Sequence, residues 1–399
     1  MRVLTLSTLF PDASRPTFGI FVERQTLGLA AREDVDLQVV SPIGLPPGPL
    51  RSHPRYRARS QLPLFEWWKG LAVHRPRFLH FPGPGVRFAP RLMARALLPL
   101  LREMRRDFPF DVIDAEYFWP DGPVAARLGR ALGVPVSIKA RGSDIHVWGK
   151  RDFSRSQIIS AANAAEGMLS VSQALKRDMV ALGLEEEAIR VHYTGVDLQK
   201  FAIADRNVAK AAIGISGPLI VCVGYLIERK GQALLVEAMK KMPGVTLLLV
   251  GGGPARERLA TQIANAGLSK RVHLLGPQPH EALPALFAAA DVSVLPSASE
   301  GLANVWVESL ACGTPVVVAD VGGARELIDT EAAGLIVART PDAIARAVFT
   351  LLANPPDRHE TRRSAERFRW DLNTETLHAH LSALIERHQR RGDQAALPA

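Results

Sequence analysis

The chain has 399 residues, of which 47% are hydrophobic and 22% charged, and this composition excludes a disordered or low-complexity protein. Single hydrophobic cores stop growing near ~250 to 300 residues, so the length predicts two domains. The only cysteines, Cys222 and Cys312, exclude a disulfide scaffold and a cysteine-rich zinc module. No apolar run approaches the ~18 to 20 residues of a membrane span, and the first residues are typical of a strand and not of a signal peptide. A cytoplasmic protein is therefore expected.

The net charge of +9 is concentrated in one stretch. Residues 51–100 contain ten basic residues and one acidic residue, Glu66. Such a patch could attract nucleic acid, an anionic membrane surface or an anionic substrate. Alternatively, the stretch is an arginine-rich surface that is exposed to solvent and has no binding function.

The first half of the chain alternates β-type runs with helical ones. Strands are predicted at 3–9, 36–41, 112–115 and 136–140, helices at 21–32, at 90–106 and from 122, and a further helix-strand-helix-strand set over 154–192. The alternation is interrupted between residues 42 and 90, where ten prolines and the aromatic cluster Phe65, Trp67 and Trp68 predict long loops or irregular hairpins. We interpret this stretch as a basic, proline-rich insert in the first domain.

The second half is more regular. Short continuous apolar runs lie at 219–223, 245–250, 272–275, 292–295 and 315–318, separated by helical segments. Continuous runs are expected where helices cover both faces of a parallel sheet. The fold class is therefore α/β, with two doubly wound, Rossmann-like parallel-sheet domains joined near residues 197–207 and a cleft between them. Ligands of such sheets bind at the carboxyl ends of strands, so the residues after each run are the candidate site.

The stretch 296–315 follows a predicted strand and opens a helix. Gly301 permits a sharp turn, after which the amides of Leu302, Ala303 and Asn304 would point from a helix N-terminus toward a phosphate or diphosphate. Further into the helix, Glu308 could accept two hydrogen bonds from a vicinal diol such as ribose. The alternative is that Glu300 is a helix-start carboxylate and that Glu308 lies on a solvated face.

Several motifs together resemble a known family. Glu300 and Glu308, with seven residues between them, followed by the segment 311–317 and by Gly322-Gly323, resemble the Glu-x7-Glu signature of retaining GT-B glycosyltransferases of family 4. The resemblance extends over nearly the whole chain, through the loop Gly-Tyr-Leu-Ile-Glu-Arg-Lys-Gly at 224–231, the glycine turn at 251–254, and the segments 11–25, 170–172 and 194–197. Together with Pro120-Asp121-Gly122, this combination of motifs resembles bacterial polysaccharide-assembly members of the family.

The resemblance implies a GT-B architecture with an acceptor-binding domain at 1–200 and a nucleotide-sugar-binding domain at 201–372. It also implies that the C-terminal helix, 373–399, crosses back to the first domain. Lys230 would neutralise the leaving diphosphate, Glu308 would hold the ribose, Glu300 would contact the transferred sugar, and Gly19 would let the backbone approach the donor. The full donor-binding set comprises Gly19, Tyr225, Arg229, Lys230, Gly251, Gly252, Glu300, Gly301, Leu302, Ala303, Asn304 and Glu308.

The chain departs from the family pattern at three positions. Tyr225 stands where the phosphate loop often has an arginine, and Arg229 is a candidate substitute. The usual His-Gly-x-Asp reads Arg141-Gly142-Ser143-Asp144. Arg141 cannot act as a titrating base, but it could bind an anionic group such as a diphosphate. For that reason it is a catalytic candidate beside Glu300 and Lys230. The third departure is Thr194 in place of asparagine. Asp121, Asp144 and Ser172 are the acceptor-site candidates.

Metal and cofactor motifs have little support. Asp34-Val35-Asp36 has the spacing of a metal-binding Asp-x-Asp but lies in a predicted turn, and the histidines form no zinc-binding pattern. The chain also lacks a phosphate-binding Gly-x4-Gly-Lys-Ser/Thr loop and a full nicotinamide fingerprint. We therefore expect no metal and no cofactor, since the nucleotide-sugar would be a substrate.

The predicted function is retaining, metal-independent transfer of a sugar from a UDP- or GDP-sugar to a glycan or lipid-linked acceptor in bacterial envelope or exopolysaccharide synthesis. By resemblance, the leaving phosphate would assist the acceptor hydroxyl on the front face. The alternatives are a GT-B sugar-nucleotide epimerase, a retaining glycosidase that uses Glu300 and Glu308, and a degenerate nucleotide-binding membrane scaffold.

The basic insert gives a further expectation about partners. It would dock the protein peripherally on anionic headgroups at the inner face of the plasma membrane, and no nucleic-acid partner is expected. The docking residues would be Arg51, Arg55, Arg57, Arg59, Lys69, Arg75 and Arg77 with Trp67 and Trp68.

Overall fold

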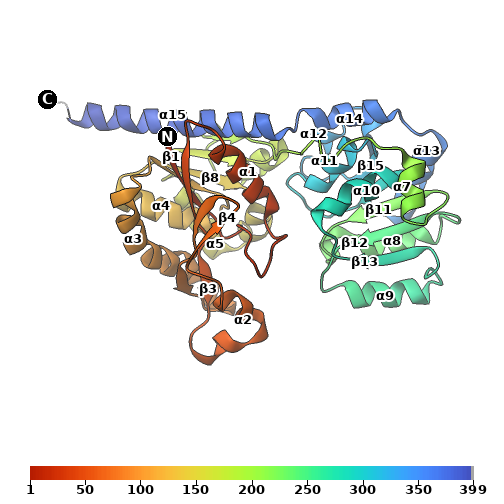
Figure 1. The fold of residues 1–399 in the computed structure, drawn as a ribbon, viewed down its shortest axis with the longest axis horizontal. Coiled ribbons are helices and arrows are strands. Elements are labelled where there is room, and N and C mark those ends of the chain that lie inside the picture. The colour runs from red at the N-terminus through yellow and green to blue at the C-terminus, as the bar shows by residue number, and fades with distance from the viewer. Residues whose placement is uncertain (397–399) are drawn as a thin grey trace. The chain divides into compact units, whose positions relative to one another are not determined.

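The computed structural model describes residues 1–396, apart from a few side chains that include Arg55, so that part of the docking prediction lies outside the described residues. The chain divides into two compact units (Figure 1). The first comprises Met1–Tyr193 and the chain from Asp371 onward, and the second comprises Thr194–Trp370. The predicted boundaries at 200 and 372 lie a few residues from these.

The first unit is built on an eight-stranded sheet of order β10-β9-β8-β7-β1-β2-β5-β4. All neighbours pair in parallel except β4 and β5, which form an antiparallel hairpin at one edge. The strands are β1 (Arg2–Leu6), β2 (Asp36–Val40), β4 (Phe65–Trp68), β5 (Leu71–His74), β7 (Val112–Ala115), β8 (Val136–Ala140), β9 (Gly167–Ser170) and β10 (Ile189–Val191). Every residue of β7 and β8 is buried, as expected for central strands covered on both faces.

The helices of this unit are α1 (Ile20–Ala30), α2 (Pro54–Ser60), α3 (Ala89–Asp107), α4 (Asp121–Leu132), α5 (Asp152–Ala162), α6 (Gln173–Ala181) and α15 (Trp370–Ala396). All but α2, which packs beside β3, cover the eight-stranded sheet. In α3, the buried residues Met93, Leu97, Leu101 and Met104 recur every three or four positions. They therefore form one apolar stripe that packs into the core of the unit.

The insert at 42–90 is more ordered than its prolines predicted. A separate two-stranded parallel sheet pairs β3 (Ile43–Leu45) with β6 (Arg77–Leu79), and β5 extends the main sheet by pairing in parallel with β2. Alternate residues of β5, Leu71 and Val73, are buried, which is the period-two pattern of a sheet with one covered face. The prediction of long loops or irregular hairpins holds for the hairpin of β4 and β5. It missed the parallel pairings of β3 with β6 and of β2 with β5, because these strands are too short to stand out among prolines.

Three of the predicted docking residues are engaged inside the unit. The Arg75 side chain is fully buried, where its guanidinium forms an ion pair with Glu66 and donates to the Pro11 carbonyl oxygen at 2.8 Å. The Trp68 indole N–H and the Lys69 ammonium both bond the carboxylate of Glu23. The prediction that Arg75 contacts lipid headgroups is therefore wrong, since a fully buried guanidinium cannot reach a membrane surface.

The helix α15 runs along the first unit (Figure 1). Leu377 and Leu381 are buried in the same cluster as Val3 and Val39 of the central strands. The His380 imidazole lies 3.1 Å from the Ser137 hydroxyl of β8. The C-terminal helix is thus an integral layer of the first unit.

The second unit has a six-stranded, all-parallel sheet of order β13-β12-β11-β14-β15-β16. Its strands are β11 (Leu219–Val223), β12 (Thr246–Val250), β13 (Val272–Gly276), β14 (Val292–Leu295), β15 (Val316–Ala319) and β16 (Gly334–Val337). Its helices are α7 (Arg206–Ala212), α8 (Gln232–Met239), α9 (Arg256–Asn265), α10 (Leu283–Ala289), α11 (Asn304–Ala311), α12 (Ala324–Leu327), α13 (Pro341–Ala353) and α14 (Arg358–Glu366). The prediction of two doubly wound α/β domains is confirmed, with β16 as an additional edge strand.

Among residues 1–396, no helix is long and apolar enough to cross a membrane.

Candidate functional site

The strand order of the second unit marks a ligand-binding position. The chain runs from β11 through β12 to β13 on one side of the sheet and then returns to place β14 on the other side of β11. Such a switch point leaves an opening at the carboxyl ends of the two flanking strands. The loop that follows β11 contains residues 224–231, and the loop that follows β14 contains residues 296–303, so both motifs of the sequence analysis meet there.

The two loops are in direct contact. The Ala298 amide donates to the Arg229 carbonyl oxygen at 2.7 Å, and Gly231 packs against Pro296 so closely that a Cβ on it would lie 2.4 Å from the Pro296 carbonyl oxygen. Gly231 also has a φ of +78°, which favours glycine. A larger residue at 231 would push the loops apart.

An ion pair joins the charged residues of these loops. Lys230 Nζ lies 2.6 Å from Glu300 Oε1, and the two side chains are 15% and 10% exposed. Arg229 lies 3.8 Å from the other carboxylate oxygen of Glu300, and its guanidinium donates to the Ser299 carbonyl. The structure thus brings together two of the three predicted catalytic residues, Glu300 and Lys230, and the candidate substitute cation.

The Glu300 loop is held from its other side by the glycines after β15. The Gly323 amide donates to the Gly301 carbonyl oxygen at 2.7 Å. A Cβ on Gly322, whose φ is +52°, would lie 2.3 Å from the Glu300 carbonyl oxygen. Helix α11 then begins at Asn304 with no side-chain hydrogen bond from its cap residue, Ala303. Its N-terminal amides and positive dipole end are therefore suited to an anionic ligand.

Glu308, in α11, is held by a histidine that the sequence analysis missed. His280 Nε2 lies 2.8 Å from Glu308 Oε1, and Lys200 Nζ lies 3.0 Å from His280 Nδ1. An ammonium can only donate, so Nδ1 accepts and the Nε2 hydrogen points to the carboxylate. The ring also packs edge-on against Phe201, with centroids 5.1 Å apart. Glu308 is therefore part of an oriented polar chain and does not lie on a solvated helix face.

The other donor candidates differ in accessibility. Tyr225 is 59% exposed, whereas Leu302 and Ala303 are buried. Gly251 has a φ of +144°, and a Cβ on it would lie 2.1 Å from the Gly224 carbonyl oxygen, so the glycine turn packs on the first loop. A Cβ on Gly252 would make only ordinary contacts with Pro277.

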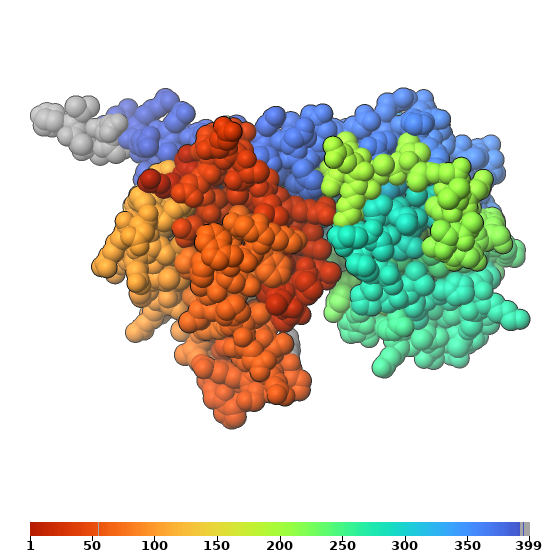
Figure 2. All heavy atoms as spheres, viewed as in Figure 1, coloured from red at the N-terminus to blue at the C-terminus, as the bar shows by residue number. Residues whose placement is uncertain are grey.

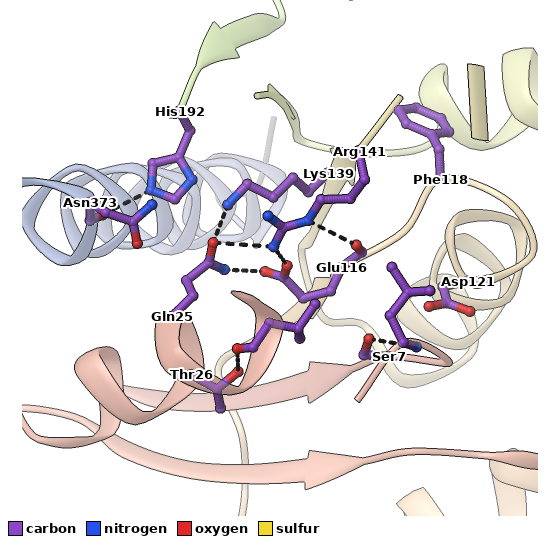
Figure 3. Close-up of polar contacts among 12 residues, drawn as sticks. Ser7, Gln25, Thr26, Glu116, Phe118, Asp121, Lys139, Arg141, His192 and Asn373 are labelled. Carbon is purple, nitrogen blue, oxygen red and sulfur yellow. Dashed lines mark hydrogen bonds and ion pairs between the residues drawn. The ribbon is translucent and has the colours of Figure 1, made fainter. Parts of the chain in front are cut away.

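The first unit has its own switch point between β1 and β7, where a buried polar network lies (Figure 3). The Arg141 guanidinium forms an ion pair with Glu116 and donates to Gln25 Oε1 at 3.2 Å. Gln25 also donates to Glu116 and accepts from Lys139. The Arg141 side chain is 5% exposed, and its Nη1 is buried without a hydrogen-bond partner among the described residues. No described residue satisfies the hydrogen-bonding capacity of this N–H group.

Burial and mutual charge determine protonation in this network. Burial, together with repulsion by Arg141, lowers the pKa of Lys139 to about 7, although Glu116 and Asp114 oppose the change. Burial raises the pKa of Asp114 well above its usual value, and the neighbouring Glu116 adds to the rise. Although burial acts to raise the pKa of Glu116, Arg141 and Lys139 outweigh it, and the pKa is lowered. The network therefore keeps Glu116 ionised against Arg141.

The predicted acceptor residues are fully buried. Asp121 Oδ2 accepts from the Thr8 amide at 2.9 Å, whereas its Oδ1 has no partner among the described residues. Asp144 accepts from the amides of Phe118, Arg141, Gly142 and Ile145, so it orders the loop after β8. Ser172 caps α6 by accepting from the Leu175 amide at 3.0 Å. Gly19 caps α1 with a φ of +70°, and a Cβ there would collide with the Leu9 carbonyl. The roles of Asp121, Asp144 and Ser172 in acceptor binding, and that of Gly19 in donor binding, remain predictions.

The sequence did contain a signal for the residues that were missed. Asp114 and Lys139 are charges inside short apolar strands, and Glu116 directly follows β7. Charged residues are rarely buried unless they are paired. Gln25 and His280 have no comparable signal.

Among residues 1–396, no group of three or more His, Cys, Asp or Glu side chains could hold a metal ion, and metal independence remains a prediction.

Two family models match the chain, each over one of the two halves. The model of Glycosyltransferase Family 4 matches residues 22–200, and that of Glycosyl transferases group 1 matches residues 205–368. Together they span nearly all of both units. The chain belongs to the GT-B glycosyltransferases that combine these two families.

Curated relatives include two bacterial glycosyltransferases. The chain is 28% identical to TuaC of Bacillus subtilis (strain 168), a glycosyltransferase named for teichuronic acid biosynthesis, over 87% of this chain and 88% of that protein. It is 36% identical to the D-inositol 3-phosphate glycosyltransferase of Mycobacterium bovis (strain BCG / Pasteur 1173P2), over 55% of this chain and 49% of that protein.

Solved structures match the fold at low identity. Sucrose-phosphate synthase from Thermosynechococcus elongatus superposes with a TM-score of 0.79 at 20% identity, covering 97% of this chain and 99% of that one. Anabaena HepE in complex with UDP and glucose superposes with a TM-score of 0.74 at 21% identity, covering 96% and 99%.

Proposed function

We propose that this protein is a retaining, metal-independent glycosyltransferase that takes a sugar from a nucleoside diphosphate donor bound by the second unit. The observation that carries the proposal is the contact between Lys230 and Glu300 beside the uncapped N-terminus of α11 at the switch point. In the transition state, negative charge develops on the leaving diphosphate, so a fixed cation and helix-terminal amides there lower the barrier. Arg229 adds a second cation in place of the arginine that Tyr225 replaces.

The remaining donor contacts follow from the same geometry. Glu308, oriented by His280, would accept hydrogen bonds from the two ribose hydroxyls, and Glu300 would contact the transferred sugar. The sugar's anomeric carbon would lose its bond to the diphosphate oxygen and gain one to the acceptor oxygen on the same face. The acceptor proton would go to the leaving phosphate, so no protein nucleophile is required.

We propose that the first unit binds the acceptor, a glycan or lipid-linked glycan of bacterial envelope or exopolysaccharide synthesis, and that Arg141 contacts an anionic group there. The name of the Bacillus subtilis relative supports this class of acceptor, and the UDP complexes of HepE support UDP as the nucleoside diphosphate of the donor. The buried, unpartnered Arg141 Nη1 supports the anionic contact. We expect the protein to act in the cytoplasm, with a nucleotide-sugar as its donor substrate.

Peripheral membrane docking is the further part of the proposal, and it depends on the edge strand β4. Trp67 and Phe65 are 71% and 44% exposed, and their rings pack edge-on with centroids 5.8 Å apart. Exposed aromatic rings next to basic residues suit an anionic membrane interface. Co-sedimentation with anionic liposomes should decrease in Trp67→Ser, and equal sedimentation of the variant would contradict docking through β4.

A thermal-shift panel tests the donor site directly. UDP, GDP, ADP, TDP, NAD and free sugars would be compared on wild type and Glu308→Ala. A ligand at ~100 times its dissociation constant adds ~2.7 kcal/mol of stability. We expect a shift with one nucleoside diphosphate that Glu308→Ala loses. A shift only with NAD or a free sugar, or none at all, would contradict the proposed donor site.

A further inference from the structure

The insert of the first unit contains a pocket whose charged lining is entirely basic. The pocket has a volume of about 650 Å³ and is lined by the guanidinium-bearing residues Arg51, Arg57 and Arg77 and by the polar residues Ser52, Ser60 and Gln61. This volume lies within the ~300 to 1,000 Å³ that is usual for small-molecule sites. The segment around α2 forms a projecting lobe of the first unit (Figure 2).

The positive charge of this pocket is not balanced by nearby carboxylates. Among the described residues, none of the three lining arginines forms an ion pair. Glu66, the one acidic residue of the stretch 51–100, is paired with the buried Arg75. Asp12 is likewise paired with Arg15. The pocket therefore has a local excess of cationic charge.

Neutral acceptors orient two of the arginines. Arg51 Nε donates to the Pro46 carbonyl oxygen at 3.1 Å. Arg77 donates to the Arg75 carbonyl oxygen at 3.0 Å and to that of Leu62. Carbonyl groups fix the direction of a guanidinium but do not neutralise it. The remaining N–H groups are therefore pre-positioned for an anion, which reduces the entropy lost on binding.

Arg59, in the last turn of α2, adds to this excess of positive charge. Its Nε is buried without a hydrogen-bond partner among the described residues. Burial lowers the pKa of Arg59 to about 10, and the charges of Arg15 and Arg77 contribute to the decrease. An anion bound nearby would relieve this repulsion.

We propose that the pocket lined by Arg51, Arg57 and Arg77 is a binding site for a phosphate group. Guanidinium groups bind phosphate with two parallel hydrogen bonds, and a phosphate monoester carries nearly two charges and three acceptor oxygens. The Ser52 hydroxyl and the Gln61 side-chain amide supply further donors, whereas the Ser60 hydroxyl already donates to the Arg57 carbonyl oxygen at 2.7 Å. This site lies outside the donor loops and does not depend on the glycosyl transfer proposed above. The phosphate would come either from a soluble phosphate ester or from a lipid headgroup.

Binding to the full chain tests the site without donor or acceptor. Isothermal titration with inorganic phosphate and with glycerol 1-phosphate would be compared with sedimentation on vesicles of phosphatidylcholine alone and of phosphatidylcholine with one fifth phosphatidylglycerol. The variant is Arg51→Gln/Arg57→Gln, since both side chains are exposed and their loss should not unfold the unit. The matched control is Arg95→Gln, an exposed arginine of α3 outside the pocket.

The expected result is binding that weakens at least tenfold in the double variant and stays unchanged in Arg95→Gln. If this occurs with the soluble phosphates, the ligand is a soluble phosphate ester, and if it occurs only with the phosphatidylglycerol vesicles, the ligand is a headgroup. Absence of binding to every probe, or equal weakening in the double variant and the control, would overturn the site. Because the assay contains no nucleotide, its outcome is separate from that of the donor-site test.

Discussion

His280 is the residue that holds Glu308, although it lies 28 positions earlier in the chain. It receives a hydrogen bond from Lys200 and donates one to Glu308, so the carboxylate is oriented before any ligand arrives. Orientation of a binding carboxylate by a second polar group reduces the conformational cost of ligand binding. His280 is therefore a positioning residue for the proposed ribose contact.

Replacement of this histidine should weaken donor binding and leave the fold intact. We expect His280→Ala to raise the dissociation constant of the stabilising nucleoside diphosphate about tenfold, since a hydrogen bond to a charged group contributes ~1.5 to 3 kcal/mol. In turnover assays KM should rise more than kcat. His273→Ala, in the same unit, is the control. If the double variant His280→Ala/Glu308→Gln were additive, the two side chains would not act together.

The buried side chain of Asp121 should make the free energy of unfolding depend on pH. Burial raises the pKa of Asp121 to about 7, so the folded protein retains a proton that the unfolded chain releases near pH 4. The stability from this proton is fully present below pH 4 and is lost as the pH rises through about 7.

The variant Asp121→Asn keeps the oxygen that accepts from Thr8 but cannot ionise. We expect the free energy of unfolding of wild type, relative to Asp121→Asn, to fall by about 1.4 kcal/mol per pH unit between pH 4 and 7. Urea unfolding at a series of pH values measures this difference, with the exposed Asp152→Asn as control. A difference that does not change with pH would show that Asp121 titrates normally.

At the scale of elements, α15 completes the core of the first unit although it comes last in the chain. The side chains of three leucines of this helix are at most 1% exposed, whereas Leu372 of the same helix is 41% exposed. The three are Leu377, Leu381 and Leu384. Burial of a leucine side chain contributes ~1.5 to 3 kcal/mol, and a cavity adds to the cost of removing it. The helix is therefore a main source of stability for the first unit.

This contrast within one helix gives a matched test. Leu381→Ala should lower the free energy of unfolding of the first unit by about 2 to 5 kcal/mol, and Leu372→Ala by less than about 1 kcal/mol. Chemical denaturation monitored by hydrogen exchange in β1 and β8 separates this unit from the other. Equal effects of the two substitutions would mean that α15 does not pack as described.

At the scale of the whole molecule, each unit has its own sheet, core and candidate site. All donor candidates except Gly19 belong to Thr194–Trp370, and so do His280 and Lys200. The acceptor candidates and the Arg141 network belong to the other unit. Binding of the nucleoside diphosphate should therefore be a property of the second unit alone.

The fragment 194–370 tests this division. We expect it to fold and to bind the stabilising nucleoside diphosphate within about threefold of the full chain, but to transfer no sugar, because the unit proposed to bind the acceptor is missing. Far-UV circular dichroism checks folding, and titration calorimetry measures binding. A folded fragment without affinity would show that residues of the first unit, Gly19 among them, are needed for donor binding.

The sequence by itself determined the α/β class, the two doubly wound units and the loops that form the candidate donor site. These features are local, because continuous apolar runs predict buried parallel strands and a glycine before a helix predicts an anion-binding turn. Only the tertiary structure decided that Arg75 is buried, that the insert extends the sheet, and that His280 holds Glu308. Each of these features depends on which distant segments become neighbours. Strand order and packing determine those neighbours, and the spacing of residues along the chain does not.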